Sequence, residues 1–115
     1  MKKTAQEYFT HCRNSKDGDY VGVEHGHIVR ICGTTFGICN RGTRRYPNWR
    51  VTDILTGCGI YDSKLMASGK KMPDIKKVLR SKEFQKRWAN TKDSSNYADC
   101  IKSFAAMLNK KGQTK

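Results

Sequence analysis

The segment from residue 20 to residue 61 limits the possible folds more than any other part of the chain. It carries Val, Ile, Thr, Tyr, Phe and Trp in short runs that glycines separate, which is typical of strands joined by turns. Parallel strands need a crossover of roughly a dozen residues or more, and these connections are shorter. The segment therefore predicts a small antiparallel sheet of four to five short strands, at residues 20–24, 27–32, 34–40, 49–55 and 59–61.

Glycines mark the expected connections in this sheet. We expect tight turns at His25-Gly26 and Thr56-Gly57, while Gly33 forms either a turn or a bulge in one bent strand. Residues 41–48 are the longest connection within the segment. Because loops run over the protein surface, we expect this one to be exposed.

The N-terminal residues carry a helix signal. Thr4 and Glu7 have the spacing of a capping box, in which each side chain accepts a hydrogen bond from the other residue's backbone N–H. A short apolar stripe follows, made of Tyr8, Phe9 and Cys12. The sequence predicts an N-terminal helix that ends near residue 14.

The chain after residue 62 has helical patterning. Pro73 suits the first turn of a helix, where its missing N–H costs no hydrogen bond. Phe84 and Trp88 would lie on the wrong side of one continuous helix, so we expect a break near Ser81, which can cap a second helix. A third helix is expected from about residue 95 onward.

These elements predict an α+β fold: an N-terminal helix, a small antiparallel sheet at about 20–61, and a helical C-terminal half packed on it. A chain of 115 residues has the length of one compact domain, so we expect residues 1–115 to fold together, with 1–62 as helix plus sheet and 63–115 as a basic helical part. The sequence has no apolar run of about 18 residues and no secretory signal, which favours a cytoplasmic location and no membrane partner.

The charge is the strongest functional signal. The formal net charge is +13, and it is unevenly spread. Residues 1–62 hold nine basic and six acidic residues, whereas residues 63–115 hold fourteen basic and four acidic ones. So large an excess of positive charge favours a polyanionic partner.

Arginines cluster with aromatic residues in and beside the 41–48 connection. The planar guanidinium group of arginine binds phosphate through paired N–H donors, and aromatic rings stack on unpaired bases. The sequence therefore predicts nucleic-acid contacts here, with Tyr46 as the better stacking candidate. In the alternative, Trp49 is a core residue, as a tryptophan at the start of a strand more often is, and the arginines only solubilise the loop. The candidates are Arg41, Arg44, Arg45, Tyr46, Trp49 and Arg50.

A second basic group lies in the first C-terminal helix and the residues before it. Such a run is most often a solvated helix face. With the net charge of this chain, we expect it to add a general attractive field for a polyanion. Its members are Lys70, Lys71, Lys76, Lys77 and Arg80.

The cysteines and histidines include one set of residues that could bind a metal ion. The five cysteines are odd in number and irregularly spaced, which favours reduced thiols over a disulfide framework. His25 and His27 would point the same way on a strand, and Cys32 and Cys39 could complete a zinc site with them. The spacing of zinc fingers is absent from the sequence, so we expect no cofactor and keep zinc at these four residues as an alternative.

Catalytic patterns are weak. Cys58 lies between two glycines in an expected turn, but nothing in the sequence places a base beside it. Asp53 interrupts an otherwise apolar strand, and we expect Arg50 or Arg30 to pair with it across the sheet. Paired carboxylates are scarce, and no phosphate-binding glycine loop is present. We therefore expect a protein that is not an enzyme.

Charge, aromatic residues and the lack of catalytic patterns together predict a non-enzymatic nucleic-acid-binding protein, with RNA or single strands slightly favoured over duplex DNA. The alternative is a small accessory protein of a phage or mobile element that inhibits a host protein or nucleoprotein complex by binding an acidic face of it.

Overall fold

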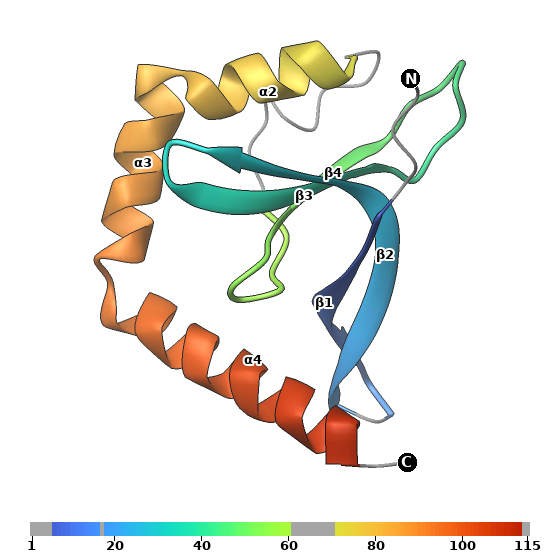
Figure 1. Ribbon diagram of the computed structural model, residues 1–115, viewed down its shortest axis with the longest axis vertical. Coiled ribbons are helices and arrows are strands. Elements are labelled where there is room, and N and C mark those ends of the chain that lie inside the picture. Colours follow the sequence, from blue (N-terminus) through green and yellow to red (C-terminus); the bar gives the residue numbers. More distant parts are fainter. Residues whose placement is uncertain (1–5, 17, 61–70, 114–115) are drawn as a thin grey trace.

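The computed structural model describes residues 6–16, 18–60 and 71–113. A four-stranded antiparallel sheet in the order β1-β2-β3-β4 is followed by three helices, which confirms the α+β class (Figure 1). The elements are β1 (Gln6–Asn14), β2 (Gly18–Ile31), β3 (Thr34–Asn40), β4 (Trp49–Asp53), α2 (Met72–Arg80), α3 (Lys82–Lys92) and α4 (Ser95–Gln113).

The prediction of an N-terminal helix is wrong, because Gln6–Asn14 form strand β1. It pairs with β2 over its whole length, from Gln6 opposite Gly26 to Asn14 opposite Gly18. Tyr8 and Thr10 are buried while Phe9 between them is exposed, which is the two-residue alternation of a strand. Glu7 accepts a hydrogen bond from His25 at 3.1 Å instead of capping a helix, and Thr4 lies outside the described residues.

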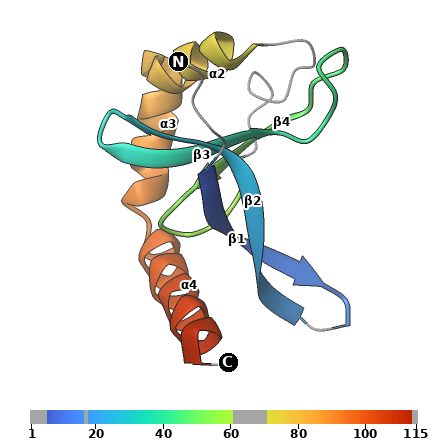
Figure 2. The same cartoon turned by 45° about the vertical axis from the view of Figure 1, so that its right-hand side comes forward.

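The turn predicted at His25-Gly26 is also wrong, since β2 continues through it as one strand of 14 residues. Up to Gly26 this strand pairs with β1, and from His27 it pairs with β3, so it bends between two partners (Figures 1 and 2). A Cβ on Gly26 would lie 2.3 Å from the backbone oxygen of Ile38. The glycine is needed because another strand approaches its backbone closely.

The remaining connections agree more closely with those predicted from the sequence. Cys32 and Gly33 both have positive φ, at 50° and 82°, as the two central residues of a type I′ hairpin turn require, so Gly33 is in a turn. Strand β4 ends at Asp53, and Gly59 forms only an isolated bridge to Thr52 in place of a fifth strand. The last residue of that predicted strand, Tyr61, lies outside the described residues.

The helices begin and break where the sequence predicts. The hydroxyl of Ser81 accepts a hydrogen bond from Phe84 N at 3.2 Å and caps α3. Ser94 does the same for α4, accepting from Tyr97 N at 3.2 Å. The break at Ser81 lets α3 turn its own apolar face toward the sheet.

The core lies between one face of the sheet and helices α2 and α3. Phe36 of β3 is fully buried, and its ring centroid lies 6.2 Å from that of Phe84 and 5.8 Å from that of Trp88. Such aromatic pairs add to the free energy gained by burying their surface. The buried cluster consists of Ile31, Phe36, Ile38, Val51, Ile75, Leu79, Phe84 and Trp88.

Asp53 lies on the core-facing side of the sheet, directly opposite Phe36, and is 1% exposed. Its Oδ2 accepts hydrogen bonds from Tyr97 Oη at 2.7 Å and from Thr56 Oγ1 at 3.1 Å. The sequence predicted an arginine partner, whereas hydroxyl groups satisfy this carboxylate. The bond from Tyr97 ties α4 to the end of β4.

Candidate nucleic-acid interface

The base of the 41–48 loop is closed by the side chain of Asn40. Its Oδ1 accepts hydrogen bonds from Gly42 N at 2.9 Å and from Asn48 N at 2.8 Å. Arg41 N also donates to Asn48 O at 2.9 Å. These bonds continue the pairing of β3 with β4 beyond the last strand pair and hold the loop out from the sheet.

The tip of the loop presents its side chains to solvent. Thr43 closes a turn with Tyr46, since Tyr46 N donates to Thr43 Oγ1 at 2.9 Å and Thr43 N donates to Tyr46 O at 3.1 Å. Arg44 and Arg45 lie inside that turn and are exposed, and Tyr46 is 72% exposed. The Arg45 guanidinium carbon lies 5.7 Å from the Tyr46 ring centroid, a cation–π distance.

The other predicted residues of this cluster lie at the base of the loop, where they contact the rest of the protein. Arg41 forms an ion pair with Glu24 of β2, so part of its charge is compensated within the protein. Trp49 is half-buried and packs against the core cluster, and Arg50 is half-buried beside it. The structure therefore separates an exposed tip, formed by Arg44, Arg45 and Tyr46, from this base.

Of the basic residues of α2, Lys77 and Arg80 are exposed and Lys76 is half-buried. Ile75 and Leu79 are fully buried, and Lys76, Lys77 and Arg80 follow them on the other side of the helix. Lys71 is exposed at the N-cap position, and Lys70 lies outside the described residues. Figures 1 and 2 both show the N-terminal end of α2 on the same side of the sheet as the 41–48 loop.

The four zinc candidates do not come together. His27 is directly opposite Ile38, so Cys39, the next residue along β3, lies on the other face of the sheet. His25 instead contacts Glu7, the Cys39 thiol donates to Glu24 at 3.5 Å, and Cys32 is exposed in the turn after β2. Within the described part of the chain, no three His, Cys, Asp or Glu side chains gather as a metal site requires.

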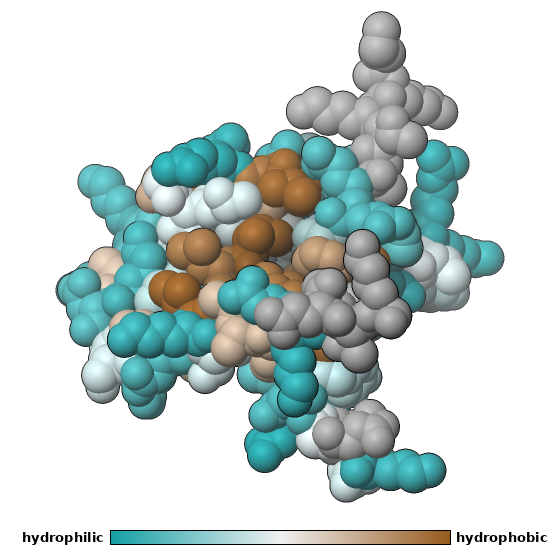
Figure 3. Space-filling model, turned by 60° about the horizontal axis from the view of Figure 1, so that its bottom comes forward, coloured by the Kyte–Doolittle hydropathy of each residue, from teal (hydrophilic) through white to brown (hydrophobic). Residues whose placement is uncertain are grey.

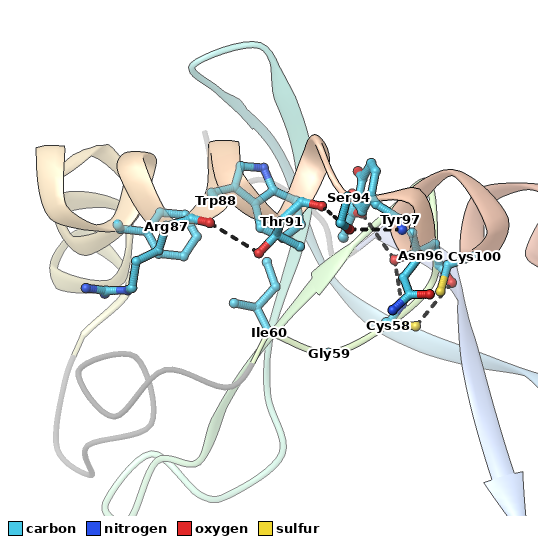
Figure 4. A pocket seen from close by; sticks show the side chains of 13 residues that line it. Cys58, Gly59, Ile60, Arg87, Trp88, Thr91, Ser94, Asn96, Tyr97 and Cys100 are labelled. Carbon is cyan, nitrogen blue, oxygen red and sulfur yellow. Dashed lines mark hydrogen bonds between the residues drawn. The ribbon is translucent and has the colours of Figure 1, made fainter.

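A pocket of about 410 Å³ lies between α3, α4 and the segment after β4 (Figure 4). Phe84, Trp88 and Ile60 form apolar walls, and Cys58 and Cys100 line it as well. Figure 3 shows apolar surface in the middle of a hydrophilic rim on the face turned toward the viewer.

Sequence reasoning missed the surroundings of Cys58. Its sulfur lies 3.8 Å from Nδ1 of His11, and Nε2 of that histidine lies 3.3 Å from Oδ1 of Asp19. Burial, and to a lesser extent the nearby Cys100 and Asp53, raises the pKa of the Cys58 thiol. The sequence carries no clear signal for this contact, because His11 and Cys58 are 47 positions apart and the sequence predicts a helix at His11.

The described residues thus define a small α+β domain whose sheet carries a basic, aromatic hairpin loop. No known protein family, curated protein or solved structure matches the chain. None of the helices in the described ranges is long and apolar enough to cross a membrane.

Proposed function

We propose that this protein binds nucleic acid without catalysing a reaction, and that the tip of the 41–48 loop is the main contact. The observation that carries the proposal is the exposed combination of Arg44, Arg45 and Tyr46 on a loop whose base is closed by hydrogen bonds. A preformed loop loses little conformational freedom when it binds, so more of the contact energy appears as affinity.

The two kinds of side chain at the tip perform different tasks. The guanidinium groups of Arg44 and Arg45 bind phosphate oxygens, and the Tyr46 ring stacks on a base. Stacking requires a base that is not already paired inside a duplex, and so RNA loops or single strands are favoured over duplex DNA. Lys71, Lys76, Lys77 and Arg80 add long-range attraction, which salt screens.

The test is fluorescence anisotropy with labelled single-stranded RNA, single-stranded DNA and duplex DNA, each over a series of salt concentrations. We expect the affinity for a single strand to remain measurable at about 150 mM salt and to fall steeply as salt rises. Tyr46→Ala should weaken single-strand binding about tenfold and leave the salt slope unchanged, because base stacking is worth ~1–3 kcal/mol.

Two double charge-reversal variants distinguish specific contacts made by the loop from diffuse electrostatic attraction. The variant with Arg44→Glu and Arg45→Glu changes the net charge as much as a control with Lys82→Glu and Lys86→Glu, two exposed positions on α3. We expect the loop variant to lose far more affinity, and Lys110→Glu to have little effect. Equal losses in the two double variants would show that only net charge matters and would overturn the loop as the site.

The second candidate is the accessory protein that inhibits a host protein or nucleoprotein complex. It is favoured by an exposed apolar pair on the β1–β2 hairpin, where Phe9 is 45% exposed and lies directly opposite Val23, which is 43% exposed. Exposed apolar residues that adjoin one another suit a protein partner. Loss of binding to all three nucleic acids at about 150 mM salt would favour this candidate.

A further inference from the structure

Cys58 has a base within reach of its thiol, although nothing in the sequence reveals it. This matters because burial raises the pKa of the thiol, so a neighbouring base is needed to take its proton. His11 Nδ1 is 3.8 Å from the Cys58 sulfur, within reach of a thiol–imidazole hydrogen bond. The far nitrogen of the ring, Nε2, is 3.3 Å from Asp19 Oδ1, so the carboxylate fixes the orientation of the ring. A thiol, a base and a group that orients the base are the parts of an activated nucleophile.

The backbone and the helix packing hold His11 in this place. His11 N donates a hydrogen bond to Gly57 O at 2.7 Å, which joins β1 to the residue just before Cys58. On its other side the imidazole stacks on Phe104 of α4, with ring centroids 6.1 Å apart. Phe104 is 1% exposed, and a Cβ on Gly57 would lie 2.4 Å from its ring. The thiol and its base are therefore packed against each other.

A second thiol lies at the same pocket. Cys100 of α4 is exposed, and Figure 4 shows its sulfur facing that of Cys58 where α4 meets the segment after β4. Both residues line the pocket, which is open to small molecules. A nucleophilic thiol with a neighbouring thiol that can react next is the arrangement used in thiol–disulfide exchange.

The same geometry is less suited to acyl transfer. An acyl-transfer site needs N–H donors aimed at the oxyanion that forms on the substrate. The backbone N–H of Cys58 instead donates to Thr56 Oγ1 at 3.2 Å, within the protein. The attack of a thiolate on a disulfide sulfur produces no oxyanion and needs no such donors.

We propose that Cys58 and Cys100 form a redox-active dithiol in which Cys58 attacks a low-molecular-weight disulfide and Cys100 resolves the product. This site is separate from the 41–48 loop, and the proposal does not depend on nucleic-acid binding.

The reaction balances with the small disulfide as oxidant. His11 takes the proton of the Cys58 thiol, and the thiolate attacks one sulfur of the small disulfide, which breaks its S–S bond and releases one thiolate. That thiolate takes up a proton to become a thiol. The Cys100 thiolate, after losing its own proton, then attacks the Cys58 sulfur, forms the Cys58–Cys100 bond and releases the second small thiol. Two protein thiols are oxidised to one disulfide while one small disulfide is reduced to two thiols.

The test uses the reduced full-length protein with glutathione disulfide as the probe, quenched at intervals by alkylation and followed by intact-mass and peptide mass spectrometry. In the wild type we expect a peptide that links Cys58 to Cys100 through a disulfide, with no lasting adduct on either residue, while the exposed Cys32 is modified separately. In Cys100→Ser we expect a stable glutathione adduct on Cys58. An adduct on Cys58 that persists in the wild type would overturn the role of Cys100.

Cys32 gives an internal reference for the role of His11, because it is an exposed thiol in the turn after β2 of the same molecule. In the Cys100→Ser background, we expect His11→Gln to slow the modification of Cys58 about tenfold relative to Cys32, since a positioned base is lost. Circular dichroism of this variant checks its fold. An unchanged ratio of Cys58 to Cys32 modification in a folded His11→Gln variant would overturn the proposal, as would failure of Cys58 to react in Cys100→Ser.

Discussion

Replacing Tyr97 by phenylalanine tests how much one hydrogen bond contributes to holding α4 on the sheet. The Tyr97 hydroxyl donates to Oδ2 of Asp53 at 2.7 Å, and Asp53 is 1% exposed. A hydrogen bond to a carboxylate contributes about 1.5–3 kcal/mol to stability, because the acceptor is costly to leave unsatisfied. Thr56 still donates to the same oxygen, so the loss falls below the top of this range. We expect Tyr97→Phe to lower the free energy of unfolding by about 2 kcal/mol.

The substitution isolates the hydroxyl group because phenylalanine keeps the ring. The Tyr97 ring makes an edge contact with Trp88 at a centroid distance of 5.7 Å, and that contact is retained. Urea denaturation followed by tryptophan fluorescence gives the free energy of unfolding, with an unchanged m-value as the sign that the unfolded state is the same. The matched control is Tyr46→Phe, which removes a hydroxyl from a 72% exposed ring and should change stability by less than about 0.5 kcal/mol.

A double-mutant cycle with Asp53→Asn completes the test. If the two side chains stabilise the fold through each other, the double variant loses less stability than the two single losses added together. The reasoning is refuted if Tyr97→Phe has the stability of the wild type within about 0.5 kcal/mol, or if the two losses simply add.

Three further predictions concern the core and the sheet. Gly26→Ala should destabilise by about 1–3 kcal/mol in urea denaturation and more than Gly22→Ala, because the added methyl group meets backbone at the first position and side-chain atoms at the second. Phe36→Ala should cost about 3–5 kcal/mol in the same assay, since it leaves a cavity in the aromatic cluster; a loss below about 1 kcal/mol would contradict the packing described. Burial raises the pKa of the Tyr8 and Tyr97 phenols above the ordinary value of 10, so unfolding releases protons at alkaline pH. Stability should therefore fall as pH rises beyond about 10, measured by thermal unfolding, and the fall should be smaller in Tyr97→Phe.

The C-terminal helices could be predicted from the sequence because their signals are local. Ser81 caps α3, and the helical spacing of Phe84 and Trp88 already placed them on a face different from that of the preceding helix. Strand β1 could not be predicted in the same way. Its nine residues are stabilised by pairing with β2, a partner that neither propensity nor spacing reveals.

The two candidate sites differ in the same way, since one rests on residues that are close in the sequence and the other on residues that are far apart. The 41–48 loop was predictable, since its arginines and Tyr46 are neighbours in the sequence and lie between two runs of strand-forming residues. The contact between His11 and Cys58 joins residues 47 positions apart. It exists only because β1 is a strand beside the segment after β4, and assigning a helix to β1 concealed it.

The side chain of Asn40 has a consequence for how this protein can change over evolution or by design. It fixes both ends of the 41–48 loop through the backbone N–H groups of Gly42 and Asn48, so the closure does not depend on which side chains occupy the tip. The entropic cost of a longer loop grows only slowly with its length. Residues 43–47 can accordingly be exchanged or extended while β3 and β4 keep their register. The sheet can thus carry loops of different sequence and length at one fixed place.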